Sequence, residues 1–230
     1  MELSGKTVIV TGGFGALGAV VAEAVAASGA RVALVDRVPA PPVSLMERLG
    51  ANAAAFGGRD LTDPEDAKRT IDEAAANGLH GLVNIAGGFR WETLKDGDIA
   101  TWDFLYRLNL KSAVCACKAA LPHLKEGGRI VNIGAGAAAK AGLGMGAYAA
   151  SKAGVAKLTE ALSEELKGHG ITVNALLPSI IDTPANRADM PKADFSKWVT
   201  PQAIADVILF LLSEKSRAIT GASIPVPGQV

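Results

Sequence analysis

Short apolar runs rich in β-branched residues alternate with longer stretches of helical periodicity along the chain of 230 residues. The runs predict strands at residues 7–10, 31–35, 82–85, 129–133, 171–176 and 223–226. The longer stretches predict helices at residues 19–28, 65–76, 101–124, 147–166 and 201–212. Alternation of this kind is typical of a mostly parallel sheet with helices on both faces. The sequence therefore predicts a single doubly wound α/β domain over residues 1–230.

One segment departs from this alternation. Residues 183–200 are polar, contain proline and show no clear period. We therefore predict that this segment is the most mobile part of the chain.

Composition and charge exclude several classes of protein. Hydrophobic residues make up 49% and aromatic residues 5% of the chain, which suits an α/β domain better than an aromatic-rich sandwich. The 23 basic and 23 acidic residues balance without a basic block, so nucleic-acid binding is not expected. No apolar run is long enough for a membrane span, and the first residues do not form a secretory leader.

The cysteines and histidines carry little functional signal. Cys115 and Cys117 are two residues apart in a predicted helix, where their side chains diverge, so we expect no disulfide and a cytoplasmic location. His80, His123 and His169 lack the spacing of metal ligands, and we expect no metal site.

A glycine-rich turn follows the first predicted strand, in the sequence VIVTGGFGALG. Gly12, Gly13, Gly15 and Gly18 allow the backbone to approach a pyrophosphate closely. The helix that follows would supply N–H groups and a partial positive charge. Glycine turns also serve as plain connectors, but this context favours a Rossmann-type dinucleotide site.

Asp36 ends the second predicted strand. A carboxylate there can bind the ribose hydroxyls of the adenosine half and repel a ribose phosphate. We therefore expect NAD(H) to be preferred. The neighbouring Arg37 can hold a phosphate, so NADP(H) stays open as an alternative.

Tyr148 and Lys152 lie four residues apart, which places them on one face of a predicted helix. A phenol is a poor acid or base near neutral pH, and a nearby ammonium would lower its pKa. Tyr148 would then exchange a proton with a substrate oxygen or nitrogen, while a nicotinamide exchanges the hydride.

Several motifs, in order along the chain, resemble the short-chain dehydrogenase/reductase family. They are the glycine turn, Asp60-Leu61, Asn84-Ile85-Ala86-Gly87, Asn109, Tyr148 with Lys152, and Pro178 with Thr183. The chain departs from the family pattern at Ala16 and Ser179, where the family has glycine. The resemblance implies that Tyr148, Lys152 and Asn109 are catalytic, with Asn109 holding a water beside the lysine. It implies a nicotinamide cofactor bound by Gly12, Gly13, Phe14, Gly15, Ala16, Leu17, Gly18, Asp36, Arg37, Asp60, Leu61, Asn84, Ala86, Gly87, Tyr148, Lys152, Pro178, Ile181 and Thr183.

The serine that the family carries thirteen residues before the tyrosine is Ala135 in this chain. That serine hydrogen-bonds the substrate carbonyl, and losing one such bond would cost about 1–3 kcal/mol. Within the family, dihydropteridine reductase-like members also keep the tyrosine and lysine without the serine. The chain resembles them further in Gly12–Gly18, in residues 86–89 and 124–128, and in the expected substrate loop at 183–200.

The resemblance leaves three functions open. The first is reduction of a quinonoid dihydropteridine, an activated acceptor on which Phe89, Trp91 and Trp198 would stack near Ala135. The second is oxidation or reduction of an alcohol, ketone or enone that is aligned without the serine. The third is a non-catalytic sensor or scaffold that binds NAD(H). The family also forms homodimers and homotetramers through helices at 101–124 and 147–166, so we expect a homo-oligomer that acts on a small molecule.

Overall fold

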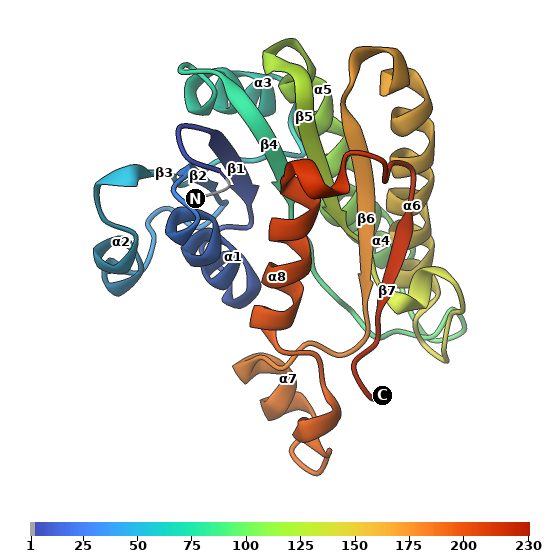
Figure 1. Ribbon diagram of the computed structural model, residues 1–230. Helices are drawn as coiled ribbons and strands as arrows, with labels where there is room; N and C mark the ends of the chain where they lie inside the picture. The colour runs from blue at the N-terminus through green and yellow to red at the C-terminus, as the bar shows by residue number, and fades with distance from the viewer. Residues whose placement is uncertain (1–2) are drawn as a thin grey trace.

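A computed structural model describes residues 3–230 as one α/β domain built on a seven-stranded parallel sheet (Figure 1). The strand order is β3-β2-β1-β4-β5-β6-β7. The strands are β1 (Thr7–Thr11), β2 (Arg31–Val35), β3 (Ala53–Phe56), β4 (Leu79–Asn84), β5 (Leu124–Ile133), β6 (Thr172–Pro178) and β7 (Ser223–Val226). The helices are α1 (Ala16–Ala27), α2 (Val43–Leu49), α3 (Pro64–Ala74), α4 (Ile99–Leu105), α5 (Ser112–Ala120), α6 (Gly146–Leu166), α7 (Pro184–Asp189) and α8 (Pro201–Leu212).

The order of the strands places a crevice at the middle of the sheet. The chain winds outward from β1 through β2 to β3, then returns to pair β4 with the other side of β1. Val10 pairs with Leu34 on one side and Val83 on the other. Ligands of doubly wound sheets bind beyond the carboxyl ends of the strands at such a switch point.

Two apolar layers cover the two faces of the sheet. On one face α1 and α8 pack together, with Val21 and Ile208 in the core. On the other face α3 packs on α5, and Ile71, Ala116 and Leu162 belong to the core there. All five residues of β1 are buried, as expected for a central strand covered on both faces.

All six predicted strands are present, and the structure adds β3 at one edge. β3 reads Ala-Ala-Ala-Phe, and alanine is a poor strand former, so its sequence gave no β signal. Helix α2 was also not predicted, although it follows the proline-rich loop directly.

The long helix predicted at 101–124 is interrupted. It consists of α4, a π-helix at Tyr106–Lys111, α5 and a 3-10 turn at Leu121–His123, and residue 124 already belongs to β5. A π-turn inserts an extra residue without a marker in the hydrophobic pattern, and such turns are frequent at functional sites.

The segment at 183–200 is more regular than predicted. It contains α7 and a 3-10 turn at Phe195–Lys197. Thr183 caps α7 by accepting the N–H of Asn186 at 3.2 Å, and Pro184 occupies the first turn. Threonine followed by proline is a helix-start signal, so this helix was predictable from the sequence.

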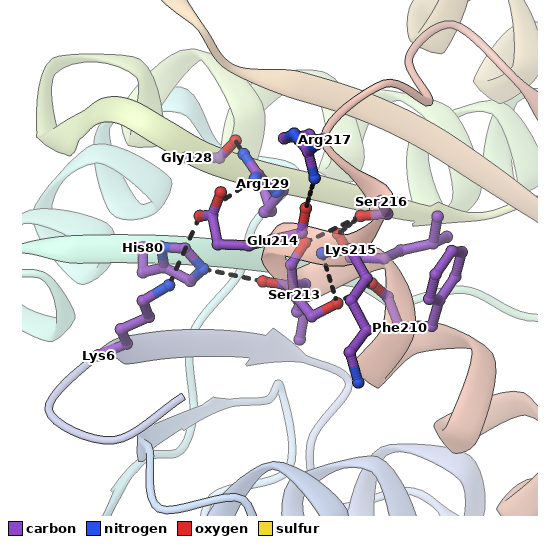
Figure 2. Close-up of polar contacts among 12 residues, drawn as sticks. Lys6, His80, Gly128, Arg129, Phe210, Ser213, Glu214, Lys215, Ser216 and Arg217 are labelled. Carbon is purple, nitrogen blue, oxygen red and sulfur yellow. Dashed lines mark hydrogen bonds and ion pairs between the residues drawn. The ribbon is translucent and has the colours of Figure 1, made fainter. Parts of the chain in front are cut away.

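Four charged or titratable side chains gather at the opposite, amino end of the strands (Figure 2). We call Lys6, His80, Arg129 and Glu214 the amino-end cluster. Arg129 is 2% exposed and donates to Glu214 Oε1 at 3.3 Å, while Lys6 Nζ lies 3.8 Å from the same oxygen. His80 Nε2 donates to the carbonyl of Leu212, the last residue of α8, at 2.9 Å. The cluster therefore fastens the end of α8 to β4 and β5.

Candidate active site

The glycine turn forms one wall of a crevice of about 550 Å³ at the carboxyl ends of β1 and β4. Gly12 has a φ of +67°, and a Cβ there would lie 2.9 Å from the backbone nitrogen of Ala86. A Cβ at Gly18 would collide with the carbonyl oxygen of Gly12. Thr11 Oγ1 accepts the N–H groups of Ile85 and Ala86 at 3.1 and 3.2 Å, which holds the two crevice-forming loops together.

The start of α1 is open toward an anion. Gly15 is the N-cap residue, and no side chain accepts a hydrogen bond there. The N–H groups of the first helical turn have no partner within the helix and, together with the helix dipole, favour a phosphate. The crevice thus fits the pyrophosphate of a dinucleotide.

Asp36 lines the crevice at the end of β2, as do Arg37 and Arg59. Its Oδ2 accepts the N–H of Phe14 at 3.0 Å and its Oδ1 accepts the N–H of Val38 at 3.0 Å. Each carboxylate oxygen keeps a second lone pair for a ribose hydroxyl. The carboxylate therefore both positions the glycine turn and faces the crevice.

Helix α6 presents Tyr148 and Lys152 on one face, as expected from their spacing. Lys152 is 5% exposed, and its Nζ donates to the carbonyl of Ile133 at 2.8 Å. Burial lowers the pKa of Lys152 to about 8. No carboxylate among residues 3–230 pairs with it.

The expected lowering of the Tyr148 pKa is wrong for this structure. Burial raises the pKa of Tyr148 to about 12. The Lys152 ammonium is hydrogen-bonded to Ile133, and desolvation of the phenolate prevails over any attraction to it. Tyr148 is therefore a phenol, and a proton donor, throughout the neutral range.

Asn109 lies in the π-helix and is buried. Its Oδ1 accepts the N–H of Gly88 at 2.8 Å, and its Nδ2 donates to the Gly88 carbonyl at 3.0 Å and to Ser151 Oγ at 2.9 Å. Ser151 in turn donates to the Tyr148 carbonyl at 2.7 Å. A Cβ on Gly87 would lie 2.7 Å from Asn109 Oδ1 and 3.4 Å from Lys152 Nζ. The structure therefore brings Asn109, Tyr148 and Lys152 together.

A second cleft of about 570 Å³ adjoins Tyr148, and we call it the substrate cleft. Ala135, Phe89 and Trp91 line it, as the sequence predicts. The Phe89 ring meets Tyr148 edge to face, with 4.9 Å between the ring centroids. Trp198 does not line the cleft: it is 6% exposed and packs on Phe195. The prediction that Trp198 stacks on substrate is therefore wrong.

The crevice contains most of the predicted cofactor residues. Its lining includes Gly12, Gly15, Ala16, Leu17, Gly18, Asp36, Arg37, Asp60, Leu61, Ala86, Gly87 and Thr183. Pro178 and Ile181 line the substrate cleft instead.

Three predicted cofactor residues turn away from the crevice. The Asn84 side chain is buried and donates to Asn132 Oδ1 at 2.9 Å, which ties β4 to β5. Gly13 packs against Leu34 of β2, and the Phe14 ring packs on the core. These residues contact the sheet and the core, and so hold the crevice-forming loops in place without lining the crevice.

Sequence reasoning missed several lining residues. In the crevice they are Val35, Arg59, Thr62, Ile85, Leu108, Ser112, Pro184 and Ala185. In the substrate cleft they are Gly136, Ala137, Met145, Ser179, Ile180, Asn186 and Met190. Asn186 and Met190 belong to the predicted substrate loop, so their region was identified but not their individual orientation.

Within residues 3–230, the structure contains no group of three or more His, Cys, Asp or Glu side chains arranged to hold a metal ion. Over the same residues, no helix is both long and apolar enough to cross a membrane.

Comparisons with known proteins agree with this geometry. Residues 6–194 match the family described as short chain dehydrogenase. The chain is 32% identical to 2-(S)-hydroxypropyl-CoM dehydrogenase 3 of Xanthobacter autotrophicus, over 99% of this chain and 97% of that protein. It is also 32% identical to D-threitol dehydrogenase of Mycolicibacterium smegmatis, over 99% of this chain and 93% of that protein. A solved structure of a blue fluorescent protein from a metagenomic library, in complex with NADPH, is 31% identical, has a TM-score of 0.91 and covers 100% of this chain and 99% of its own.

The chain belongs to the short-chain dehydrogenase/reductase family. It is an NAD(P)-dependent oxidoreductase, with the Rossmann-like fold of that family.

Proposed function

We propose that this enzyme exchanges a hydride between a nicotinamide and a small unsaturated substrate, with Tyr148 as the only hydroxyl that exchanges the proton. One observation carries the proposal. Ala135 occupies the position of the family's serine in the wall of the substrate cleft, and Ser179 Oγ already donates to the Pro227 carbonyl at 2.6 Å. Among the cleft-lining residues described, Tyr148 therefore has the one uncommitted hydroxyl proton.

The side chains around Tyr148 have separate roles in this reaction. A bound reduced nicotinamide would supply a hydride to the electron-poor atom of the substrate, which is the carbon of a carbonyl group or a ring nitrogen of a quinonoid dihydropterin. Tyr148 would give its proton to the oxygen or nitrogen on which negative charge develops, and take it back in the oxidation direction. Asn109 and Ser151 hold the first turn of α6, and Lys152 returns a proton to the site near its lowered pKa.

We infer a preference for NAD(H). Support comes from the Asp36 carboxylate in the lining of the crevice, which would repel a ribose phosphate. Arg37 and Arg59 in the same lining keep NADP(H) as an alternative, and the metagenomic relative is described with NADPH.

A quinonoid dihydropteridine is our first candidate substrate. Such a compound is already electron-poor, so a second donor to its reacting group matters little. The flat aromatic side chains of Phe89 and Trp91 in the cleft wall favour a flat heterocycle. An alcohol, ketone or enone is the second candidate, and the names of the two dehydrogenase relatives favour it.

A substrate panel distinguishes these candidates. NADH oxidation is measured with a quinonoid dihydropterin, a ketone and an enone, each in the wild type, Tyr148→Phe and Ala135→Ser. Pterin reduction that needs Tyr148 and gains nothing from Ala135→Ser supports the first candidate. Turnover of carbonyl compounds alone, raised by Ala135→Ser, supports the second. If no substrate shows turnover that depends on Tyr148, the result supports the third function, a sensor or scaffold that binds the cofactor without catalysis.

We also propose a homodimer or homotetramer, in the cytoplasm, as the working form. The α5 alanines Ala113, Ala116, Ala119 and Ala120 are buried within the domain and offer no surface to a partner. Val114 of α5 and Ala161 of α6 are exposed and remain available. Gel filtration against the monomer mass of 23.5 kDa tests this proposal.

A further inference from the structure

The wall of the substrate cleft carries no charged side chain. None of its described lining residues is Asp, Glu, Lys, Arg or His. An ionised group of a substrate would lose hydration there without gaining an opposite charge, which is costly. The cleft is therefore suited to a neutral compound.

Two aromatic side chains lie open in the cleft. Phe89 is 55% and Trp91 58% exposed, although both line a concave wall. Ala135 and Ala137 leave that region of the wall without bulky side chains. Open aromatic rings beside small residues favour a flat, conjugated ligand over a branched one.

Asn186, on α7, lines this apolar wall, and its side-chain amide has a fixed orientation. Its Nδ2 donates to the Ile181 carbonyl at 2.7 Å, and a carbonyl can only accept, so the amide cannot be flipped. Its backbone N–H is bound to Thr183 Oγ1. Among residues 3–230, nothing donates to Asn186 Oδ1, which leaves this oxygen to accept from a ligand.

We propose that Asn186 is a specificity-determining residue, and that the substrates are neutral, flat, conjugated carbonyl or imine compounds bearing an N–H or O–H that Asn186 Oδ1 accepts. The inference rests on the proposed function, because Tyr148 gives the proton to the reacting oxygen or nitrogen. Asn186 and Tyr148 then recognise two different polar groups of one ring system, which fixes its orientation in an apolar cleft.

A pair of probes that differ in one hydrogen-bond donor tests the role of Asn186. Isatin is a neutral, flat ketone with a ring N–H, and 1-methylisatin lacks that N–H. Dissociation constants are measured by calorimetry with NAD⁺ present, in the wild type, Asn186→Leu and Ser179→Ala. We expect the wild type to bind isatin about tenfold more tightly than 1-methylisatin, the value of one hydrogen bond.

The variants separate recognition from a structural effect. Asn186→Leu, which removes the acceptor oxygen, is expected to bind the two probes equally. Ser179→Ala, a matched change of another cleft residue, is expected to retain the preference. An equal affinity in the wild type, a preference that persists in Asn186→Leu, or binding of neither probe would overturn the assignment.

The neutral character of the substrate is tested with isatin-5-sulfonate against 5-nitroisatin. We expect the sulfonate to bind at least about tenfold more weakly, because its charge finds no cation in the cleft. Equal binding would contradict that expectation.

The outcome also separates this inference from the proposed function. NADH oxidation is followed with the same probes in the wild type and in Tyr148→Phe. Asn186-dependent binding without any turnover would refute the proposed function and leave the recognition intact. Tyr148-dependent turnover without a preference for the N–H probe would support the proposed function and refute the recognition role of Asn186.

Discussion

Each end of the sheet contains a buried cation, but only the one at the amino end is paired with a carboxylate among residues 3–230. At the amino end, Arg129 is buried but faces Glu214, which Lys6 also approaches. At the carboxyl end, Lys152 is also buried and donates only to the carbonyl of Ile133, with no carboxylate paired to it within residues 3–230. The pairing with Glu214 keeps Arg129 charged and fastens α8. Burial without a counter-ion lowers the pKa of Lys152 toward neutrality.

This difference separates a structural site from a chemical one. A buried charge that is paired adds little chemistry, because its protonation state is fixed across the working pH range. A buried base without a counter-ion titrates where an enzyme operates, and such shifts gather at active sites. The comparison therefore predicts that changes at the carboxyl end alter turnover, whereas changes at the amino end alter stability and leave turnover almost unchanged.

The largest expected effect is that of Lys152→Met. We expect turnover to fall by about 10²–10⁴-fold, the usual contribution of a proton-transfer group. Folding stability at pH 7 should rise by about 1–3 kcal/mol, because the fold disfavours the charged form of a lysine whose pKa falls from 10.5 to about 8.

The pH dependence checks the sign of this effect. Below pH 8 wild-type Lys152 is protonated in both the folded and unfolded states, and the full burial cost is present. Between about pH 8 and 10.5 only the unfolded state keeps the proton, so the stability advantage of Lys152→Met should shrink across that window. Denaturant unfolding at pH 7 and pH 10 measures it, and an advantage that grows with pH would contradict the account.

The next effect concerns the pH dependence of turnover. Since burial raises the pKa of Tyr148 to about 12, the phenol is protonated over the neutral range. Reduction, which consumes that proton, should be independent of pH between 6 and about 8. Oxidation, which needs the phenolate, should rise about tenfold per pH unit. Initial rates in both directions test this, and an oxidation rate that levels off near pH 7 would contradict it.

At the amino end, Glu214→Gln removes the carboxylate and leaves Arg129 buried. We expect a loss of about 1–3 kcal/mol in the free energy of unfolding, limited by the 64% exposure of the Glu214 side chain. Turnover at 25 °C should stay within about twofold of wild type, since no catalytic group is touched. Lys157→Gln, which breaks only a surface pair with Glu160, is the matched control and should change little.

The smallest effect is expected at the crevice. Asp36→Ala should reduce the preference for NADH over NADPH, about tenfold or less, by removing a ribose contact and a repulsive charge. Asp36→Ala will also lower kcat/KM for both cofactors equally, because Asp36 accepts the N–H of Phe14 and so positions the glycine turn. The ratio of kcat/KM values isolates the specific part, and a wild-type enzyme that prefers NADPH would refute the role of Asp36.

The sequence predicted the framework of the fold, because the central strands are short apolar runs and the glycine turn stands between a predicted strand and a predicted helix. The sequence did not predict elements whose structure depends on contacts with other parts of the fold. β3 is a strand because β2 pairs with it, despite its alanines. The π-turn around Asn109 leaves the hydrophobic pattern unchanged, so its place inside a predicted long helix was not foreseen.

The candidate site shows the same limit. Spacing placed Tyr148 and Lys152 on one helix face, and the family resemblance implied that Ala135 lies at the substrate. Spacing gave no measure of burial, so it predicted a lowered Tyr148 pKa where desolvation raises it. Nor did it distinguish Trp91, which lines the cleft, from Trp198, which packs inside the substrate loop against Phe195.

The most direct test of the central claim is a single-turnover measurement of NADH oxidation in Tyr148→Phe beside wild type, with NADH binding and thermal unfolding of both proteins. We predict a rate at least about 100-fold lower in Tyr148→Phe, with NADH affinity within about threefold and a melting temperature that does not fall. A rate near that of the wild type would show that Tyr148 does not carry the proton and would contradict the account.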